Sequence, residues 1–279
     1  MSLLVIYATD LHGDTAKYRQ LLKIARSVKA VAMLNGGDLF PTNGDLLSEQ
    51  AEFVERFLPN YFEDVQAAEI PFICCLGNDD LAACDLSFSS LVARFSVVHN
   101  LTRQSCRLGD YEIVGLDLVV DYPYRLKDRC RLDTDSSPVP RLRSRALLSS
   151  SSGWHEVQDW HRYIQSLPSI DSELTLLPAP SQPENTILLF HMPPDRVGLD
   201  CCDDGRNVGS SSIRRFIEDR QPRVSLHGHI HESPEFSGVW KTRLNKSLCI
   251  QPGQGSSLTY VVLDLESCSA ERVVETVDR

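Results

Sequence analysis

Five short apolar runs in this chain each end in a cluster of polar residues. None of the runs exceeds seven residues, and polar positions do not alternate within them, which is typical of strands buried on both faces. The runs lie at residues 3–8, 30–34, 70–76, 187–190 and 224–226. Strands of this kind need an apolar cover on each side, and this requirement restricts the chain to layered folds.

Helix-like stretches separate the apolar runs. Residues 15–28 and 48–65 place their apolar side chains on one stripe at helical spacing, and residues 213–219 follow three serines that can cap a helix. Further strands are predicted at residues 111–118, 247–250 and 258–265. The alternation of strands and helices predicts an α/β protein with a large core built from two sheets.

Size and composition favour one folded domain. The chain has 279 residues, of which 42% are hydrophobic, and a chain this apolar offsets its ordering entropy by burial. Residues 121–185 are the least regular part of the sequence and are too poor in apolar residues to build a second core. We therefore predict a single domain over residues 1–279, with residues 121–185 forming an irregular excursion over its surface.

Charge, hydropathy and cysteine content restrict the binding partners and the cellular compartment that we expect for this protein. The formal net charge of −10 disfavours stable binding to nucleic acid, which relies on Lys and Arg to neutralise phosphates. No apolar run approaches the roughly 18–20 residues that cross a bilayer, and the first residues lack the pattern of a signal peptide. The nine cysteines include no CxxC motif, which suits reduced thiols. We therefore expect a cytoplasmic protein without membrane contact.

The polar clusters beyond the five runs contain seven carboxylate, amide or imidazole side chains. Ligand sites in α/β proteins lie beyond the carboxyl ends of the strands, and donors of these types suit Mn²⁺ first, with Fe, Zn²⁺ or Ni²⁺ as alternatives. Seven donors are too many for one ion with an open position, so they predict two ions about 3.5–4 Å apart that share a carboxylate. The seven residues are Asp10, His12, Asp38, Asn78, His191, His229 and His231.

Each of these residues also has an ordinary explanation by itself. Asp38 and Asn78 both follow glycines, as turn residues often do, and His191 could be a simple loop histidine. The occurrence of all seven in order, each beyond an apolar run, argues against a set of unrelated explanations. His99 and His227 lie outside the pattern, and we expect them to pack in the core or to support the site from behind.

The order of these motifs resembles the signature of the calcineurin-like metallophosphoesterase superfamily. The motifs span residues 10–231, nearly the whole chain, and their last part is similar to that of small bacterial-type members. They are Asp10-x-His12, Gly37-Asp38, Gly77-Asn78-x-Asp80, His191 and Gly228-His229-x-His231. The resemblance implies a four-layer αββα sandwich of two mixed β-sheets flanked by helices, with a dinuclear metal centre at one edge.

The resemblance also implies which residues bind each of the two ions and which reaction the protein catalyses. One ion would have as its ligands Asp10, His12, Asp38 and His231. The other would have as its ligands Asp38, Asn78, His191 and His229, so that Asp38 bridges both. Members of the superfamily hydrolyse phosphomonoesters or phosphodiesters by in-line attack of a metal-bridging water or hydroxide. The implied function is metal-dependent hydrolysis of a small phosphoester.

The chain departs from the family pattern at Asp79, where most members have histidine. We expect Asp79 to be ionised, because the ordinary pKa of aspartate is about 3.9 and nearby cations lower it further. This charge argues against a general-acid role and weakens binding of a monoester dianion more than that of a diester monoanion. We therefore predict a bias toward phosphodiesters. Asp80 is expected to orient the loop or a ligand histidine.

Two alternatives remain open at this stage. The protein could be a phosphomonoesterase, or a scaffold that keeps the fold without turnover. The presence of all seven donors favours an enzyme, and the acidic net charge argues against a DNA nuclease.

Further phosphate contacts could come from basic residues outside the motifs. The segment from Arg125 to Arg145 could fold over the site, but acidic residues interrupt it, and we expect a solvated loop. Arg196 and Arg206 lie near His191 in the sequence and are equally good candidates. Residues 201–204 (Cys-Cys-Asp-Asp) are interpreted as a loop and not as another metal site.

Overall fold

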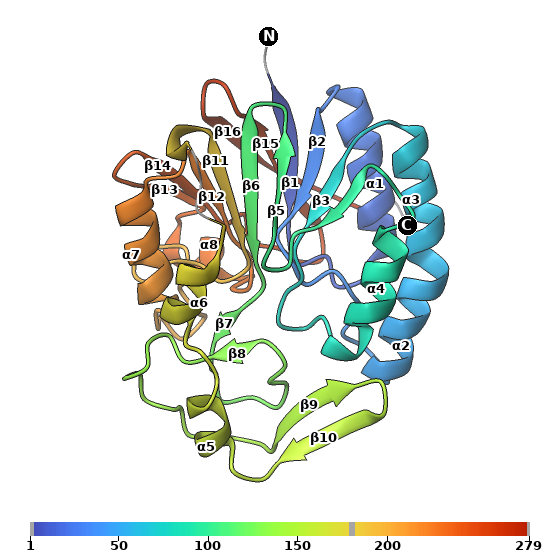
Figure 1. Ribbon diagram of the computed structural model, residues 1–279. Coiled ribbons are helices and arrows are strands. Elements are labelled where there is room, and N and C mark those ends of the chain that lie inside the picture. Colours follow the sequence, from blue (N-terminus) through green and yellow to red (C-terminus); the bar gives the residue numbers. More distant parts are fainter. Residues whose placement is uncertain (1–2, 179–181, 278–279) are drawn as a thin grey trace.

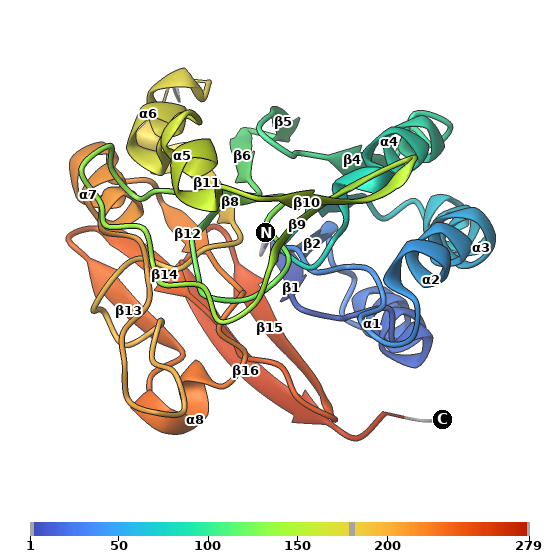
Figure 2. The same cartoon turned by 90° about the horizontal axis from the view of Figure 1, so that it is seen from below.

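The computed structural model describes residues 3–178 and 182–277. Two six-stranded sheets pack face to face, and helices cover the outer face of each sheet (Figure 1). Both sheets are mixed, because each combines parallel strands with antiparallel ones. Figure 2 shows the same arrangement from below, with the helices on the two outer sides. The predicted four-layer αββα sandwich is therefore confirmed.

The first sheet has the strand order β16-β15-β1-β2-β3-β4. Strands β1 to β4 are parallel, whereas β15 runs antiparallel to both β1 and β16. The bounds are β1 (Leu4–Ala8), β2 (Ala32–Asn35), β3 (Phe72–Cys74), β4 (Val98–Asn100), β15 (Leu258–Asp264) and β16 (Ser269–Glu275).

The second sheet has the strand order β13-β14-β12-β11-β6-β5. Its four central strands are parallel, and β5 and β13 form antiparallel edges. The bounds are β5 (Ser105–Leu108), β6 (Tyr111–Leu116), β11 (Thr186–Phe190), β12 (Val224–Leu226), β13 (Lys241–Leu244) and β14 (Ser247–Ile250).

The helices begin where the sequence supplies caps. Asp14 accepts hydrogen bonds from the first backbone N–H groups of α1, and the Ser210 hydroxyl accepts one from Ile213 in α7. The predicted helix over residues 48–65 is continuous from α2 through a π-helical turn (Phe53–Phe57) to α3. The helices are α1 (Thr15–Ser27), α2 (Leu46–Glu52), α3 (Leu58–Ala67), α4 (Asp85–Val92), α5 (Trp160–Gln165), α6 (Ile170–Leu176), α7 (Ser211–Arg220) and α8 (Ser233–Ser237). Short 3₁₀ turns lie at Ala82–Cys84 and Pro183–Asn185.

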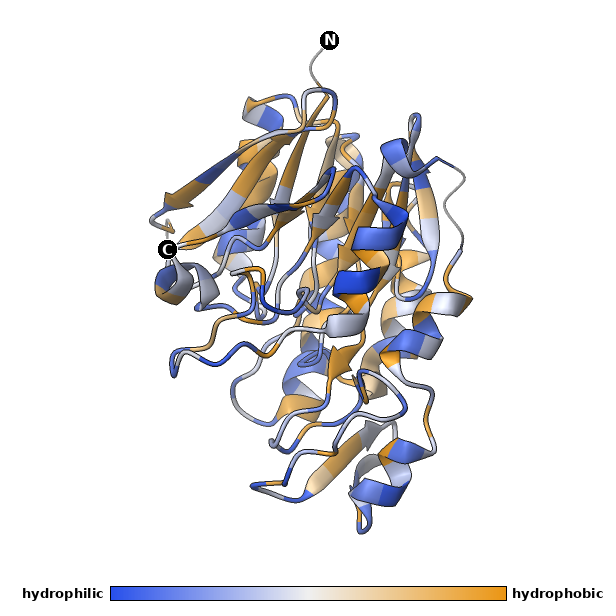
Figure 3. Cartoon of the chain, turned by 90° about the vertical axis from the view of Figure 1, so that its left-hand side faces the viewer, coloured by the Kyte–Doolittle hydropathy of each residue, from blue (hydrophilic) through white to orange (hydrophobic). Residues whose placement is uncertain are grey.

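Three apolar clusters hold the layers together. One lies between the two sheets and contains side chains such as Tyr7, Ile113 and Leu189. The other two lie between each sheet and its helices, around Phe62 on the first sheet and Phe190 on the second. In Figure 3 the strands are largely hydrophobic, while the helices also carry hydrophilic residues. Burial of the strands on both faces explains why the apolar runs do not alternate.

Residues 121–165 lie below the two sheets, α6 lies beside α7, and the segment 121–178 is more ordered than the sequence indicates (Figure 1). The segment and its approach contain β7 (Val119–Val120), β8 (Cys130–Arg131), the hairpin β9 (Ala146–Ser150) and β10 (Gly153–Val157), and helices α5 and α6. Residues 179–181 lie outside the described residues. Trp160, Ile164 and Leu174 pack in the cluster that covers the second sheet. The segment is thus partly a core element, and the one-domain division stays a prediction.

Candidate metal centre

The predicted donor residues follow five neighbouring strands at one edge of the sandwich. Strands β1, β2 and β3 are parallel neighbours in the first sheet, and β11 and β12 are parallel neighbours in the second. Because parallel strands end at the same edge, the loops that follow them converge. The chain therefore brings together residues that lie up to 221 positions apart, between Asp10 and His231.

The backbone of four donor residues adopts the left-handed conformation. The φ angles are 56° at Asp10, 45° at His12, 52° at Asp38 and 69° at His229. A non-glycine residue with positive φ carries a conformational cost, and such residues cluster at functional sites. These four residues lie in the loops that follow β1, β2 and β12, where they turn the chain after the strand ends.

Glycines next to the donors permit the close approach of these loops. A Cβ atom at Gly37 would lie 2.6 Å from Nδ1 of His191, and one at Gly77 would overlap the Asp38 carboxylate. A Cβ atom at Gly228 would likewise meet the carboxylate of Asp10. The glycines of the sequence motifs are thus required by the packing of the donors themselves.

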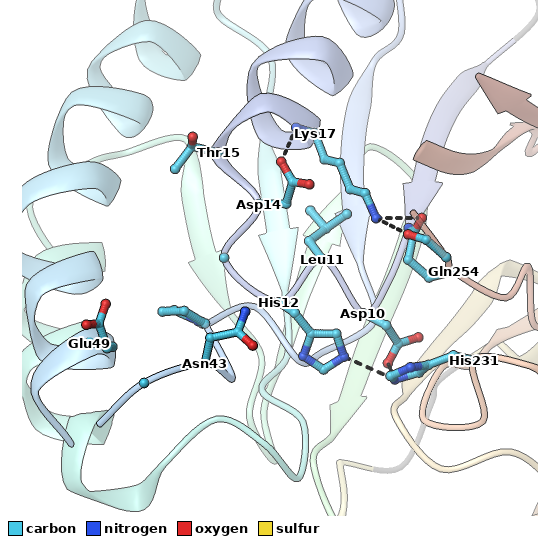
Figure 4. Close-up of a pocket in the computed structure, with 14 residues that line it drawn as sticks. Asp10, Leu11, His12, Asp14, Thr15, Lys17, Asn43, Glu49, His231 and Gln254 are labelled. Carbon is cyan, nitrogen blue, oxygen red and sulfur yellow. Dashed lines mark hydrogen bonds and ion pairs between the residues drawn. The ribbon is translucent and has the colours of Figure 1, made fainter. Parts of the chain in front are cut away.

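Four of the seven donors form a first cluster. One ligand atom from each residue lies within 4.8 Å of the others in the set Asp10, His12, Asp38 and His231. Nε2 of His12 lies 3.1 Å from Nε2 of His231, which in turn lies 3.4 Å from the Asp10 carboxylate. Figure 4 shows His12, Asp10 and His231 pointing toward one another.

The remaining three donors form a second cluster around the Asn78 amide. Its Oδ1 lies 3.0 Å from Nε2 of His191 and 2.5 Å from Nδ1 of His229. Nε2 of His191 also lies 3.4 Å from the Asp38 carboxylate. The Nδ1–H of His191 donates to the Gly36 carbonyl oxygen at 2.8 Å, which leaves Nε2 as the atom that faces the cluster. Asp38 is therefore adjacent to both clusters.

The donor set fits divalent cations. Oδ2 of Asp10 and Nδ1 of His12 are buried and have no hydrogen-bond partner among the described residues. Two imidazole nitrogens that face each other at 3.1 Å, as in His12 and His231, need a shared proton or a cation between them. Buried carboxylates are stable only when paired or bound to metal. Oxygen and imidazole donors without thiolate suit Mn²⁺, Fe and Zn²⁺.

In the chain without metal, two of the donor histidines have raised pKa values and therefore bind protons at neutral pH. Burial lowers the pKa of His191 and of His231, but the nearby Asp38 and Asp10 outweigh it and raise these pKa values to about 10 and about 9. Burial opposes ionisation of the two aspartates as well, yet the same histidines hold the carboxyl pKa values below the ordinary range. In His229 burial lowers the pKa to about 3, so this imidazole is neutral.

The family comparison agrees with this geometry. The family model described as calcineurin-like phosphoesterase matches residues 3–233, which include all seven donors. The chain belongs to this family. Members are hydrolases that act on phosphoesters with divalent metals, so this phosphoesterase has the predicted family and the predicted general class of reaction.

Solved structures share the fold of this phosphoesterase. TT1561 of Thermus thermophilus is 16% identical, with a TM-score of 0.59 over 98% of this chain and 99% of its own. A dimetal phosphatase from Danio rerio is 12% identical, with a TM-score of 0.53 over the full length of both chains. No curated protein sequence matches the chain. Within the described residues, no helix is both long and apolar enough to span a bilayer.

Asp80 of the phosphoesterase joins two of the donor loops. Its carboxylate accepts hydrogen bonds from the backbone N–H groups of Gly77 at 2.8 Å, Phe40 at 2.7 Å and Leu39 at 3.1 Å. These residues flank Asp38 and Asn78 in the sequence, so Asp80 fixes the separation of the two loops. Burial and the charge of Asp38 raise the pKa of Asp80 to about 7.

Asp79 contacts the donors through its backbone and its side chain. Its backbone N–H donates to the Asp38 carboxylate at 2.8 Å, and its own carboxylate accepts from the Asn78 amide at 2.9 Å. This second bond turns the amide oxygen of Asn78 toward the histidines. The sequence predicts that nearby cations lower the pKa of Asp79. In the chain without metal, burial and Asp38 instead raise this pKa to about 7.

Arg129 supports the loop that contains Asn78. The sequence does not indicate this role of Arg129. The guanidinium group is 2% exposed and donates to the carbonyl oxygens of Gly77 at 2.9 Å and Asp80 at 3.2 Å. It also pairs with Asp117 at 2.5 Å and Asp85 at 2.6 Å. The two carboxylates lie 12 and 44 residues away from Arg129, so no local pattern indicates the pairing.

The prediction of a solvated basic segment is therefore wrong for part of residues 125–145. Lys127 is also buried, and its Nζ pairs with Asp121 at 2.6 Å. Buried charges of this kind are stable only because each has a partner. The prediction is right for the arginines of the segment that are exposed, which are Arg125, Arg141, Arg143 and Arg145.

Two clefts open beside the donor clusters. The first, of about 870 Å³, reaches the first cluster and is lined by Asp10, His12 and His231 at one end. Figure 4 shows Lys17 in this cleft, where its Nζ donates to the Gln254 side chain. The second, of about 1130 Å³, is lined by Asn78, Asp79 and His229 at one end and by residues of the segment 120–154.

The other predicted residues lie outside the clusters. His227 is buried behind the site, and its ring lies 2.9 Å from the Met192 carbonyl oxygen. His99 lies on β4, at the edge of the first sheet. Arg206 lines the second cleft, whereas the exposed Arg196 lies 3.7 Å from Asp195. All nine cysteines are free.

Proposed function

We propose that this phosphoesterase hydrolyses phosphodiesters with two divalent cations held by the seven clustered donors. Asp10, His12 and His231 would hold one ion, and Asn78, His191 and His229 the other, with Asp38 between them. The geometry of the two clusters supports this division, and so does the position of Asp38 beside both. The Danio rerio relative, described as a dimetal phosphatase, has the same fold. Mn²⁺ is the first candidate for both ions.

The two ions would lower the pKa of a water molecule and neutralise the charge of the phosphoester oxygens. The contribution of the chain is to fix the donors before substrate arrives. The left-handed turns and the motif glycines set the donor loops, and Asp80 and Arg129 hold the loop of Asn78. Such fixed positions reduce the reorganisation that the reaction requires.

The preference for diesters is supported by one observation, the carboxylate of Asp79, which accepts a hydrogen bond from the Asn78 amide at the wall of the second cleft. Bound cations lower the pKa of a nearby carboxyl group, so Asp79 would be ionised in the loaded enzyme. A further negative charge at about 5 Å costs a substrate on the order of 3 kcal/mol per unit charge at an effective dielectric near 20. This cost applies twice to a monoester dianion and once to a diester monoanion.

The test compares two esters with the same leaving group, p-nitrophenyl phosphate and methyl p-nitrophenyl phosphate, in the presence of Mn²⁺. We expect a higher kcat/KM for the diester in the wild type. The Asp79→His and Asp79→Asn variants should each shift the ratio toward the monoester. A wild type that prefers the monoester would contradict the proposal and favour a phosphomonoesterase. No turnover of either ester, with metal bound, would favour a scaffold.

A further inference from the structure

The second cleft carries an aromatic wall that leads away from the donor clusters. The Tyr122 ring lies 6.1 Å from the His229 ring and 5.9 Å from the Tyr124 ring, measured between centroids. Tyr122 is half-buried, whereas Tyr124 is 55% exposed. Trp154 of β10 lines the same cleft and is 36% exposed. The cleft thus offers flat aromatic faces at its outer part, next to a donor histidine at its inner end.

Few aromatic side chains are exposed among the described residues, and half of these line the cleft. The exposed large aromatic side chains are Tyr124, Trp154, Tyr163 and Phe236. Two of these four, Tyr124 and Trp154, line the second cleft. Large aromatic rings left open to solvent within a pocket are typical contacts for a planar ligand group, which stacks on them.

The charge of the cleft indicates whether the planar ligand group has a charged or a neutral substituent. Five carboxylate residues line the cleft, of which Asp121 is paired with Lys127, and two arginines line it, Arg125 and Arg206. The Arg143 guanidinium also lies over the Tyr124 ring, 6.0 Å from its centroid. Arg206 is already paired with Asp204 at 2.6 Å. A further phosphate would therefore meet an excess of negative charge, whereas a neutral group with hydroxyls would find acceptors. These conditions fit a nucleoside, whose base is flat and whose sugar carries hydroxyl donors.

We propose that the second cleft binds the nucleoside of a nucleoside 5′-phosphodiester, with the base stacked on Tyr124 and Trp154. The phosphodiester would lie at the inner end of the cleft, beside Asn78 and His229. The volume of about 1130 Å³ is sufficient for a nucleoside. This inference rests on the proposed function, because it assigns the substituent of the diester that is hydrolysed there.

The test uses two diesters with the same leaving group, thymidine 5′-(p-nitrophenyl phosphate) and methyl p-nitrophenyl phosphate, with Mn²⁺. We expect the wild type to prefer the thymidine ester by at least tenfold in kcat/KM, mainly through a lower KM. Alanine substitution of an aromatic residue that stacks on a base commonly costs about tenfold in affinity. Tyr124→Ala and Trp154→Ala should therefore each reduce the preference about tenfold, and Trp154→Phe should retain most of it.

Phe236→Ala is the matched control, because Phe236 is 54% exposed but lies outside the cleft. This variant should keep the preference of the wild type. Equal hydrolysis of the two diesters by the wild type would overturn the inference while leaving the proposed function intact. So would alanine variants that change both diesters equally. Absence of hydrolysis of both diesters would overturn the proposed function as well.

Discussion

The Nε–H of Arg129 donates to the carbonyl oxygen of Gly77, the residue directly before Asn78, at 2.9 Å. Through this bond the segment below the sheets holds a loop that carries a proposed metal ligand. The same guanidinium group pairs with Asp117, which is fully buried. Arg129 thus acts on the site through the loop and is a positioning residue.

Replacement of Arg129 by methionine should lower both stability and activity. The change leaves Asp117 buried with one fewer cation and frees two carbonyl oxygens of the loop. Breaking a buried ion pair from one side costs about 3–5 kcal/mol, which urea unfolding measures. Arg129→Lys should recover part of the stability and less of kcat, because lysine lacks the planar donor geometry. Equal recovery of both would contradict a positioning role.

The Asp80→Asn variant tests the link between two donor loops. An amide in place of the carboxylate retains one acceptor oxygen but turns an NH₂ group toward backbone donors. We expect a loss of about 1–3 kcal/mol in the free energy of unfolding and a fall in kcat for methyl p-nitrophenyl phosphate. The exposed Asp110→Asn is the control and should leave both quantities unchanged. A kcat equal to that of the wild type would exclude this role of Asp80.

The close approach at Gly77 gives a sharp steric prediction. A Cβ atom there would overlap the Asp38 carboxylate, so Gly77→Ala must displace the proposed bridging ligand. We expect overpacking to cost about 1–3 kcal/mol of stability and metal affinity to fall at least tenfold in a calorimetric titration. Gly255→Ala is the matched control, because its Cβ would have no neighbour within 4 Å. Unchanged metal affinity in Gly77→Ala would contradict the placement of Asp38.

Metal binding should release protons, because His191 and His231 have pKa values of about 10 and about 9 in the chain without metal. Both imidazoles are protonated at pH 7.5 and must lose a proton to bind an ion. Calorimetry with Mn²⁺ in buffers of different ionisation enthalpy should give about two protons per chain. Affinity should therefore rise with pH and level off near pH 10. Binding heats that are independent of the buffer would argue against these ligands.

The donors themselves could be predicted from the sequence, because each lies within five residues of the end of an apolar run. The parallel order of β1, β2 and β3 and of β11 and β12 then brings them together. The buried residues that surround and support the donors could not be predicted in this way. Arg129 meets Asp85 and Asp117 only through tertiary packing, and the sequence around Arg129 is typical of a solvated loop. The raised pKa of Asp79 likewise depends on burial, which the motif does not encode.

Asp38 lies beside both donor clusters, where it would bridge the two ions. The most direct measurement is anomalous diffraction from crystals of the wild-type protein soaked in Mn²⁺. We predict two peaks about 3.5–4 Å apart, one on each side of the Asp38 carboxylate, with a loss of both or of one in Asp38→Asn. A single peak, or two peaks that do not share Asp38, would contradict the dinuclear assignment.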